Sequence, residues 1–419
     1  MAESFLLAWR ALLRGHVLTA LLALTALAHL LLPAIVRSDG TEAGGRELFL
    51  RIVPGSVYVV LCVGLVACAC GLIAHARESH RLALAAVRPI SAGALVAGPL
   101  LALVAVAGVV LAFNMCLTCA RGGWTDCRHV YEPVLEPPEK AAQQALEKIL
   151  ADENTPEEIR SAPRYRLLAI FTGNEIDRYA AIQPSSALEL PFPNEAAAVH
   201  DGVTARIRFT TQFNSRASVS GVITLGPWSA VVSNSTQAVV EIPLARPPDQ
   251  GAGWETKLNF RNTGRSMLML RPRRDVEVLT PADSFVMNML RASGQMLCVI
   301  TFLCAFGLFL SAALSRPVAM FTAFALLAVM EIAPAVVAQF PDALDVPFTD
   351  LLGLQLSRAV AFVTSPVSDP QPISDLATGT CIEWTALGRA ALVDALVAPL
   401  VLLTLAACIV RRHASAQRG

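Results

Sequence analysis

The chain has 419 residues, of which 54% are hydrophobic and 16% are charged, and its mean hydropathy is +0.54. Soluble domains are about 45–50% apolar and about 25% charged, so this composition excludes an ordinary soluble protein. Lysine plus arginine and aspartate plus glutamate both total 33. The net charge of zero lacks the basic excess expected of a nucleic-acid-binding protein. We therefore expect an integral membrane protein that does not bind nucleic acid.

Six long apolar stretches account for the hydrophobic excess. A helix needs about 20 mostly apolar residues to cross the hydrocarbon core of a bilayer. The stretches of this kind lie at 17–36, 52–75, 93–117, 293–314, 317–338 and 388–410. The sequence predicts an α-helical polytopic membrane protein with six transmembrane helices. The first stretch is longer than the apolar core of a signal peptide, so we expect it to be an uncleaved span.

Arginines at one set of span ends predict the orientation of the chain. Residues 1–16 mix apolar residues with two arginines, which indicates an amphipathic helix in the membrane interface. Further arginines lie between the second and third spans and, as Arg316, between the fourth and fifth spans. Others lie in the tail 413–419 and directly before it, at Arg411 and Arg412. Cytoplasmic segments carry an excess of lysine and arginine, so both termini are predicted to be cytoplasmic.

The connection between the second and third spans, 77–91, has the pattern of a short amphipathic helix. Leucines on it offer apolar contacts, while its arginines stay polar. Arg88 precedes Pro89, and a residue before proline is pushed out of the α region, so the helix is expected to end there. Ser91 then stands where an N-cap for the third span belongs.

A large insertion, 118–290, separates the third and fourth spans on the side predicted to be extracytoplasmic. Its first part is acidic and helix-forming. Its second part, 202–280, alternates apolar and polar residues in short runs broken by glycine, proline and asparagine. The candidate strands are 203–213, 217–225, 228–233, 237–244, 256–261, 266–271 and 275–280. This pattern predicts an α+β insertion with an antiparallel β-sandwich of about seven strands. Its arginines form either a solvated face or a docking surface for a partner or an anionic ligand.

Motifs of soluble and membrane enzymes are missing from the sequence. It contains no G-x-x-x-x-G-K-[ST], no H-E-x-x-H and no G-x-S-x-G, and its seven histidines are scattered. We find no cluster of acids and histidines that could support catalysis within the membrane, and we assign no catalytic, cofactor or metal-binding residue. This favours transport or binding over enzymatic chemistry.

The segment 77–91 resembles the corresponding segment in permease subunits of type-2 ABC exporters. In that family an acidic residue, a leucine-rich short helix and an Arg/Lys-Pro-Ile/Val-Ser turn precede the third span. The turn from Leu310 to Val318, the amphipathic N-terminal helix and the arginine-rich C-terminus are also similar. In the family the connection between the last two spans dips into the membrane, and 346–364, within the span-carrying part 291–412, is apolar enough for such a re-entrant or interfacial helix. The large insertion departs from the family layout.

The resemblance implies a permease with no enzymatic activity of its own, working with a separate ATP-binding subunit that hydrolyses ATP. It implies a homodimer or pseudo-dimer with a second permease, surrounded by membrane lipid, in the bacterial inner membrane. The segment 77–91 would be the coupling helix that docks on the ATP-binding subunit, and the cargo would be an amphiphile or glycoconjugate. The residues assigned to coupling are Glu78, Leu82, Leu84, Arg88, Pro89 and Ser91.

Two acids within predicted spans are candidates for a translocation path. A charge in a span should face protein or water, because exposure to lipid is costly. Glu331 lies in the fifth span, where it either lines the path or makes a contact between helices. Asp394 lies in the sixth span, where it lines the path, extends towards the membrane surface or pairs with Arg389.

The cysteines after the third span leave three alternatives open. Cys116, Cys119, Cys127 and His129 have a spacing that resembles a zinc site. Extracytoplasmic compartments oxidise thiols, which favours a disulfide between Cys119 and Cys127, with Cys381 as another partner. Free thiols are the third alternative.

A rival function is a membrane-anchored extracytoplasmic binding or sensor protein whose β-sandwich is the working part. A membrane enzyme would require an acid and histidine site that the sequence does not show.

Overall fold

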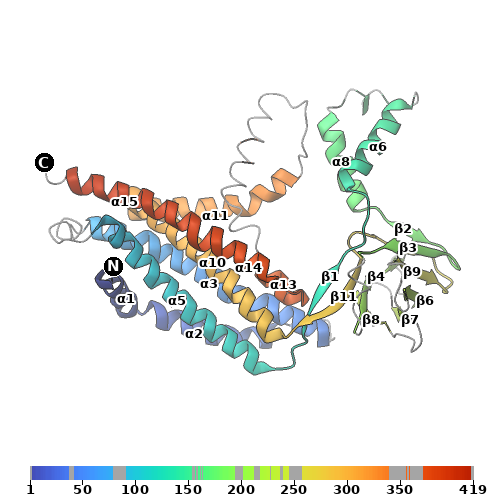
Figure 1. The fold of residues 1–419 in the computed structure, drawn as a ribbon, viewed down its shortest axis with the longest axis horizontal. Helices are drawn as coiled ribbons and strands as arrows, with labels where there is room; N and C mark the ends of the chain where they lie inside the picture. The colour runs from blue at the N-terminus through green and yellow to red at the C-terminus, as the bar shows by residue number, and fades with distance from the viewer. Residues whose placement is uncertain are drawn as a thin grey trace. The chain divides into compact units, whose positions relative to one another are not determined.

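The structure is a computed structural model. It describes all residues except 1, 37–41, 79–90, 153–155, 157–158, 161, 163, 194–201, 212–217, 227, 236–238, 245–256, 339–354, 356–357, 359–370 and 417–419. The chain divides into two compact units. The membrane unit comprises Met1–Asp126, Asp283–Ala335 and Arg358–Gly419, and the β unit comprises Cys127–Ala282 and Val336–Ser357. Among the described residues, the first unit is helical and the second holds the strands (Figure 1).

The membrane unit confirms that this is an integral membrane protein. Its helices are α1 (Ala2–Arg14), α2 (Val17–Ile35), α3 (Glu42–Glu78), α5 (Ala92–Arg121), α10 (Phe285–Ala313), α11 (Arg316–Ala338), α13 (Pro372–Thr378), α14 (Trp384–Ala390), the π-helix η1 (Ala391–Val397) and α15 (Ala398–Ala416). Within the described part of the chain, five helical segments are long and apolar enough to cross a membrane: Val17–Ile35, Gly44–Arg77, Ala92–Arg121, Phe285–Ala313 and Trp384–His413.

The remaining predicted span coincides with α11. Its described apolar stretch, Arg316–Ala328, is shorter than a full crossing, so the sixth span stays a prediction. The helices on either side of the predicted insertion are longer than the sequence indicated. α5 continues to Arg121. α10 begins at Phe285, because Ser284 caps its start by accepting a hydrogen bond from the Met287 amide, and because the polar residues before 293 are buried by tertiary contacts.

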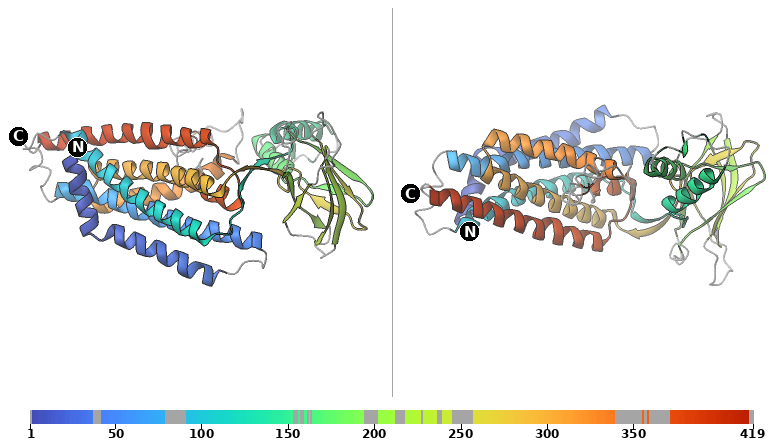
Figure 2. Two further views of the ribbon diagram at one scale, coloured as in Figure 1. Left: turned by 60° about the horizontal axis from the view of Figure 1, so that its bottom comes forward. Right: turned by 90° about the horizontal axis from the view of Figure 1, so that it is seen from above.

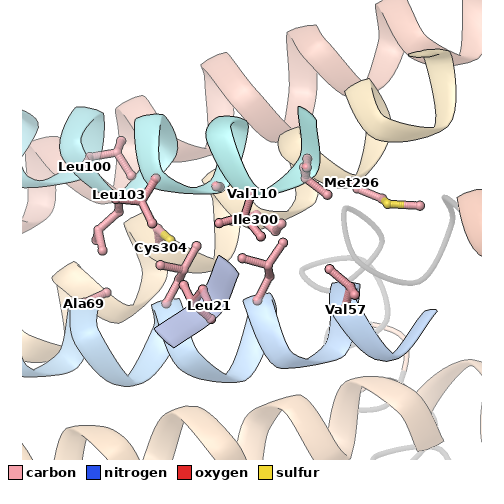
Figure 3. Close-up of a cluster of buried hydrophobic side chains, with 14 of the residues drawn as sticks. Leu21, Val57, Ala69, Leu100, Leu103, Val110, Met296, Ile300 and Cys304 are labelled. Carbon is pink, nitrogen blue, oxygen red and sulfur yellow. The ribbon is translucent and has the colours of Figure 1, made fainter. Parts of the chain in front are cut away.

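α10 lies at the centre of the membrane unit and packs against α3, α5 and α15. In Figure 3, side chains from α2, α3, α5 and α10 meet in one apolar cluster that includes Leu21, Val57, Leu103, Ile300 and Cys304. Small residues allow the closest helix contacts, as is usual in membranes. A Cβ atom built on Gly307 would lie 2.8 Å from the Cβ of Ala69 in α3.

α1 has two faces with different roles. Ser4, Ala8 and Leu12, spaced one turn apart, are buried in the membrane unit. Leu6, Leu7 and Leu13 are exposed and apolar. α1 packs against the start of α5, where a Cβ on Gly98 would approach Ser4 Oγ too closely for any side chain. These observations confirm a helix at the position predicted for an interfacial segment.

The β unit contains two helices, α6 (Pro138–Ala151) and α8 (Arg164–Ile176), and eleven strands among its described residues. The strands are β1 (Cys127–Tyr131), β2 (Ala180–Ile182), β3 (Ala187–Pro191), β4 (Thr204–Arg208), β5 (Thr210–Thr211), β6 (Ser218–Leu225), β7 (Trp228–Ser235), β8 (Val239–Pro243), β9 (Lys257–Asn262), β10 (Leu268–Leu270) and β11 (Val276–Asp283). They form three sheets with the orders β1-β11-β4-β8, β2-β10-β5 and β3-β9-β6-β7.

Side chains from all three sheets share one core, which includes Ile182, Ile207, Ile223, Phe260 and Val278. Every predicted strand is found, although the first divides into β4 and β5 around Phe209. β1, β2 and β3 were not predicted. β2 and β3 are three and five residues long, and their pairing with the distant β10 and β9 fixes them more than their own sequence does.

Candidate functional site

The end of α3 is tied to the turn between α10 and α11. The Arg77 guanidinium donates hydrogen bonds to the carbonyl oxygens of Ala312, at 3.1 Å, and Leu314, at 2.6 Å. The Ala74 amide donates to Ser311 Oγ at 2.8 Å. The last carbonyls of a helix lack partners within it and carry partial negative charge, so a cationic donor is well suited to this position.

Arg316, the first residue of α11, also belongs to this junction. Its guanidinium lies beside Gly71 of α3, where a Cβ built on the glycine would be 3.5 Å from Arg316 Nε. Gly307 lies one to two turns before the junction and permits the close approach of α3 and α10. We call this set the α3–α10 junction: Gly71, Ala74, Arg77, Ser311, Ala312, Leu314 and Arg316.

The start of α5 is tied to α1. Ser91 is the N-cap of α5, and its hydroxyl accepts a hydrogen bond from the Ala94 amide at 3.2 Å, which confirms the predicted cap. Ser4 Oγ of α1 donates to the Ala94 carbonyl at 2.6 Å. α1, the end of α3 and the last turns of α15 lie at the same end of the membrane unit (Figure 2). We call this the terminal end, and the opposite end, where α5 ends and α10 begins, the insertion end.

The predicted coupling segment lies between these two anchored helix ends. Leu82, Leu84, Arg88 and Pro89 lie outside the described residues, and Glu78 is the last residue of α3, with its side chain outside the description. Their contact with a partner subunit stays a prediction. What the structure adds is that both helices leading into this segment are fastened to other helices of the membrane unit.

The last long helix contains a π-helical turn that carries Asp394. η1 spans Ala391–Val397, and Asp394 is only 4% exposed. π-Helical turns are rare in proteins, and those that occur are often found at functional sites. The burial shows that the carboxyl faces protein, as expected for an acid in a span. Asp394 is close enough to the Cys298 thiol of α10 for an electrostatic interaction.

One face of α10 packs along α14 and η1, with successive residues of α10 meeting successive residues of the other segment. The Arg291 guanidinium lies 4.8 Å from the centre of the Trp384 ring, and Gly294 contacts Leu387. Cys298, one turn further along α10, is the residue near Asp394.

Three uncharged polar side chains of neighbouring helices are buried and have polar atoms without a hydrogen-bond partner among the described residues. They are Asn114 of α5 and Ser293 and Gln295 of α10. Both amide atoms of Asn114, the hydroxyl of Ser293 and the amide oxygen of Gln295 have no hydrogen-bond partner among the described residues. A buried polar group without a partner costs about 1–3 kcal/mol, so such groups call for an explanation such as a water or a ligand.

These three residues and Asp394 lie in the same half of the membrane unit. At about 1.5 Å per residue, Asn114 lies about 10 Å from the end of α5, and Gln295 lies about 15 Å from the start of α10. α10 packs against both α5 and η1. We call Asn114, Ser293, Gln295 and Asp394 the polar layer. The sequence indicated only Asp394, since uncharged polar residues within an apolar stretch are a weak signal.

At the insertion end, α10 holds the segment that leads into α14. Asn288 Nδ2 donates to the Thr380 carbonyl and its Oδ1 accepts from the Ile382 amide, both at 2.8 Å. The Arg291 guanidinium is 4% exposed on its side chain, pairs with Asp283 and donates to the Ile382 carbonyl at 2.8 Å. These contacts were not predicted from the sequence, because Asn288 and Arg291 precede the predicted fourth span.

Glu331 lies on α11, and its side chain is outside the described part of the chain. Its predicted role in a translocation path stays a prediction. Cys119 of α5, Cys127 of β1 and Cys381 are not joined in disulfides in the structure, and the disulfide between Cys119 and Cys127 stays a prediction. Among the described residues, no group of three or more His, Cys, Asp or Glu side chains is placed to hold a metal ion.

Several arginines of the β unit are paired with acids. Arg206 lies between Glu241, at 2.9 Å, and Glu277, at 3.1 Å, and Arg128 pairs with Glu241 at 2.7 Å. Burial would raise the pKa of Glu241, but hydrogen bonds and charge from Arg128 and Arg206 hold that pKa below its ordinary value. At these positions the arginine charge is neutralised, which favours a solvated face over a docking surface for an anion.

Comparison with protein-family models, with curated proteins and with solved structures gave no match to this chain.

Proposed function

We propose that the chain is the membrane-spanning permease subunit of an ATP-driven exporter of the type-2 ABC class. In this proposal α11 is the fifth of six spans, both termini are cytoplasmic in a bacterial inner membrane, and the β unit is an extracytoplasmic sandwich. ATP is hydrolysed by a separate subunit, and the permease acts as a dimer. The cargo is an amphiphile or glycoconjugate.

One observation carries the proposal. The two stretches that resemble the exporter family, 77–91 and 310–318, are far apart in the sequence but meet in the α3–α10 junction. Arg77 belongs to the first stretch, and its partners Ala312 and Leu314 belong to the second. A movement imposed on the segment 79–90 would therefore act on the end of α3 and, through these bonds, on the turn between α10 and α11.

The polar layer gives that movement a consequence within the membrane. α10 extends from the junction to Gln295 and Ser293, and it packs against the helix that carries Asp394. A shift of α10 against α5 or η1 would open or close a route past the polar groups on that side of α10. Glu331 on α11 lines the same route in this proposal. The chain itself makes and breaks no covalent bonds.

The test searches the reading frames beside the gene for a Walker A motif and co-expresses the full chain with the ATP-binding protein that such a frame would encode. We expect the two proteins to copurify and Arg88→Ala with Pro89→Ala to abolish copurification. Arg77→Gln is expected to leave copurification intact and to lower export by about fivefold or more, because it weakens the coupling between sites. Arg51→Gln, at an exposed pair in the same helix, is the matched control.

Asp394→Asn and Glu331→Gln are expected to lower export without lowering the amount of protein in the membrane. Unchanged export in both variants would remove these residues from the path. If no ATP-binding protein copurifies and the Arg88 and Pro89 variants keep full function, the exporter proposal fails. The β unit would then be the working part of a membrane-anchored binding or sensor protein.

A further inference from the structure

α2 and α3 enclose an apolar groove in the membrane unit. The groove has a volume of about 280 Å³ and is lined by Leu24, Leu31 and Ile35 of α2 and by Val57, Val60 and Leu61 of α3. Its two hydroxyl groups are already engaged, since Thr25 Oγ1 donates to the Leu21 carbonyl at 2.8 Å and Ser56 Oγ to the Val53 carbonyl at 2.9 Å. The groove therefore offers an occupant an apolar surface.

A second cavity of about 160 Å³ adjoins the groove at the insertion end, and Leu32 lines both. The second cavity has a cation in its wall. The exposed Arg121, at the end of α5, places its guanidinium 4.1 Å from the centre of the Phe49 ring. Trp124 packs against Phe49 with 5.5 Å between the ring centres, and this contact helps to hold the Phe49 ring in place beside Arg121.

The charges around this cavity favour an anion. Arg46 lies beside it and donates a hydrogen bond to the Gly123 carbonyl at 3.2 Å. The neighbouring Glu47 is paired with Arg51 at 3.7 Å. An arginine at the end of a span, with its guanidinium at the level of lipid headgroups, is well placed to bind phosphate, because its planar donors match phosphate oxygens.

The dimensions suit one leaflet of a bilayer. The groove extends from Leu21 to Ile35, 14 residues along α2, or about 21 Å at about 1.5 Å per residue. The hydrocarbon core of a bilayer is about 30 Å thick, so the groove exceeds the depth of one leaflet. An occupant would thus have a charged group at the membrane surface and an apolar tail reaching about half-way across.

We propose that the α2–α3 groove holds an acyl chain of an anionic membrane phospholipid, with the lipid phosphate bound by Arg121. Three features favour this occupant. Arg121 supplies a positive charge for the phosphate, the groove supplies an apolar lining for the acyl chain, and Arg121 stands at the end of a span. A helix of a second copy of the chain would match the apolar lining but would leave the Arg121 cavity unused. The proposal does not depend on the exporter function.

The experiment measures lipid retained by the purified full chain in detergent, using native mass spectrometry. Phosphatidylglycerol and phosphatidylcholine with identical acyl chains are the two probes. We expect about one phosphatidylglycerol per chain to be retained in preference to phosphatidylcholine. Arg121→Gln is expected to weaken that retention about tenfold, the loss associated with one hydrogen bond between charged groups. Arg10→Gln, at an exposed arginine of α1 at the terminal end and away from the groove, should retain lipid as the wild type does.

A second pair of variants tests the groove itself. Ala28→Phe fills the groove, whereas Ala26→Phe adds the same ring to an exposed position on α2 outside the groove lining. We expect Ala28→Phe alone to displace the lipid, with circular dichroism confirming that both variants fold. Equal retention by Arg121→Gln and Arg10→Gln, or equal retention of the two lipids, would overturn the proposal. So would an Ala28→Phe variant that changes the monomer–dimer equilibrium and leaves lipid unchanged.

Discussion

α10 and α2 are both apolar helices long enough to cross a membrane, but they occupy opposite environments. In the most apolar window of α10, 78% of the residues are buried, against 11% in α2. The buried residues of α10 include Asn288, Arg291, Ser293 and Gln295. α2 instead exposes leucines such as Leu27 and Leu30.

The difference shows that apolar character does not decide which span becomes central. Lipid is as apolar as leucine, so burial in a membrane protein depends on close packing and on polar contacts between helices. α10 has both, through Gly307 and through its polar residues. α2 has neither on its exposed side, which leaves that side to lipid.

The largest expected effect comes from removing packing in α10. Leu308 is fully buried, so Leu308→Ala should lower the free energy of unfolding by about 2–5 kcal/mol through the cavity it leaves. Leu30→Ala in α2, where the side chain is 72% exposed, should change it by much less than 1 kcal/mol. Unfolding in mixed detergent measures both. Equal effects would contradict the contrast between the two helices.

Breaking the ion pair of α10 should have the next largest effect. Asp283→Asn leaves the Arg291 guanidinium buried with one partner fewer, at a cost of about 3 kcal/mol, the low end of the range for buried pairs because Asp283 is 41% exposed. Adding Arg291→Met should recover part of this loss. Glu47→Gln, at the exposed pair with Arg51, should cost less than about 1 kcal/mol.

Two glycines should respond with opposite signs. Gly307→Ala places a methyl group against Ala69 and should destabilise the protein by about 1–3 kcal/mol. Gly108→Ala in α5 meets nothing within 4 Å and should stabilise it by up to about 1 kcal/mol through helix propensity. The same unfolding assay applies, and destabilisation by both would show that α5 is packed as tightly as α10.

Disrupting the charge network of the β unit should give the smallest loss of stability. Comparing this loss with that of the Arg291–Asp283 pair shows how much burial adds to the cost of breaking an ion pair. Arg128 and Arg206 lower the pKa of Glu241 below its ordinary value of 4.5, against the effect of burial. The stability from this network is therefore complete above pH 4.5 and is lost as the pH falls through the lower folded pKa. Because Glu241 is partly exposed, the loss should be below about 1 kcal/mol. The melting temperature of the protein measured as a function of pH should therefore fall less steeply below pH 4.5 in Glu241→Gln than in the wild type.

Local patterns were enough to locate most elements. Apolar stretches of spanning length predicted five helices, although Gly44–Arg77 and Phe285–Ala313 begin well before the predicted starts at 52 and 293, and alternation predicted β4 to β11. The N-cap at Ser91 was also predicted, because capping depends on residues three positions apart. The short strands β1, β2 and β3 were missed because their partners lie far away in the sequence.

The candidate site was predictable only in part. Asp394 could be identified as an acid in a span, but its π-helical turn and its burial against α10 result from packing. Asn114 and Gln295 gave no signal, since a single amide in an apolar stretch is ordinary. Arg291 lay outside the predicted span, and only its contacts with Asp283 and Ile382 show why it is buried.

By itself, the sequence determined that this protein is a membrane protein with long helices and a separate strand-rich unit. Span length and strand alternation act over neighbouring residues, so they can be recognised without knowing the fold. Only the tertiary structure decided that α10 is central, that α2 is peripheral and that Arg77 bonds to carbonyls more than two hundred residues away. Those outcomes depend on which surfaces meet, and pairing between distant helices leaves little trace in any single stretch of sequence.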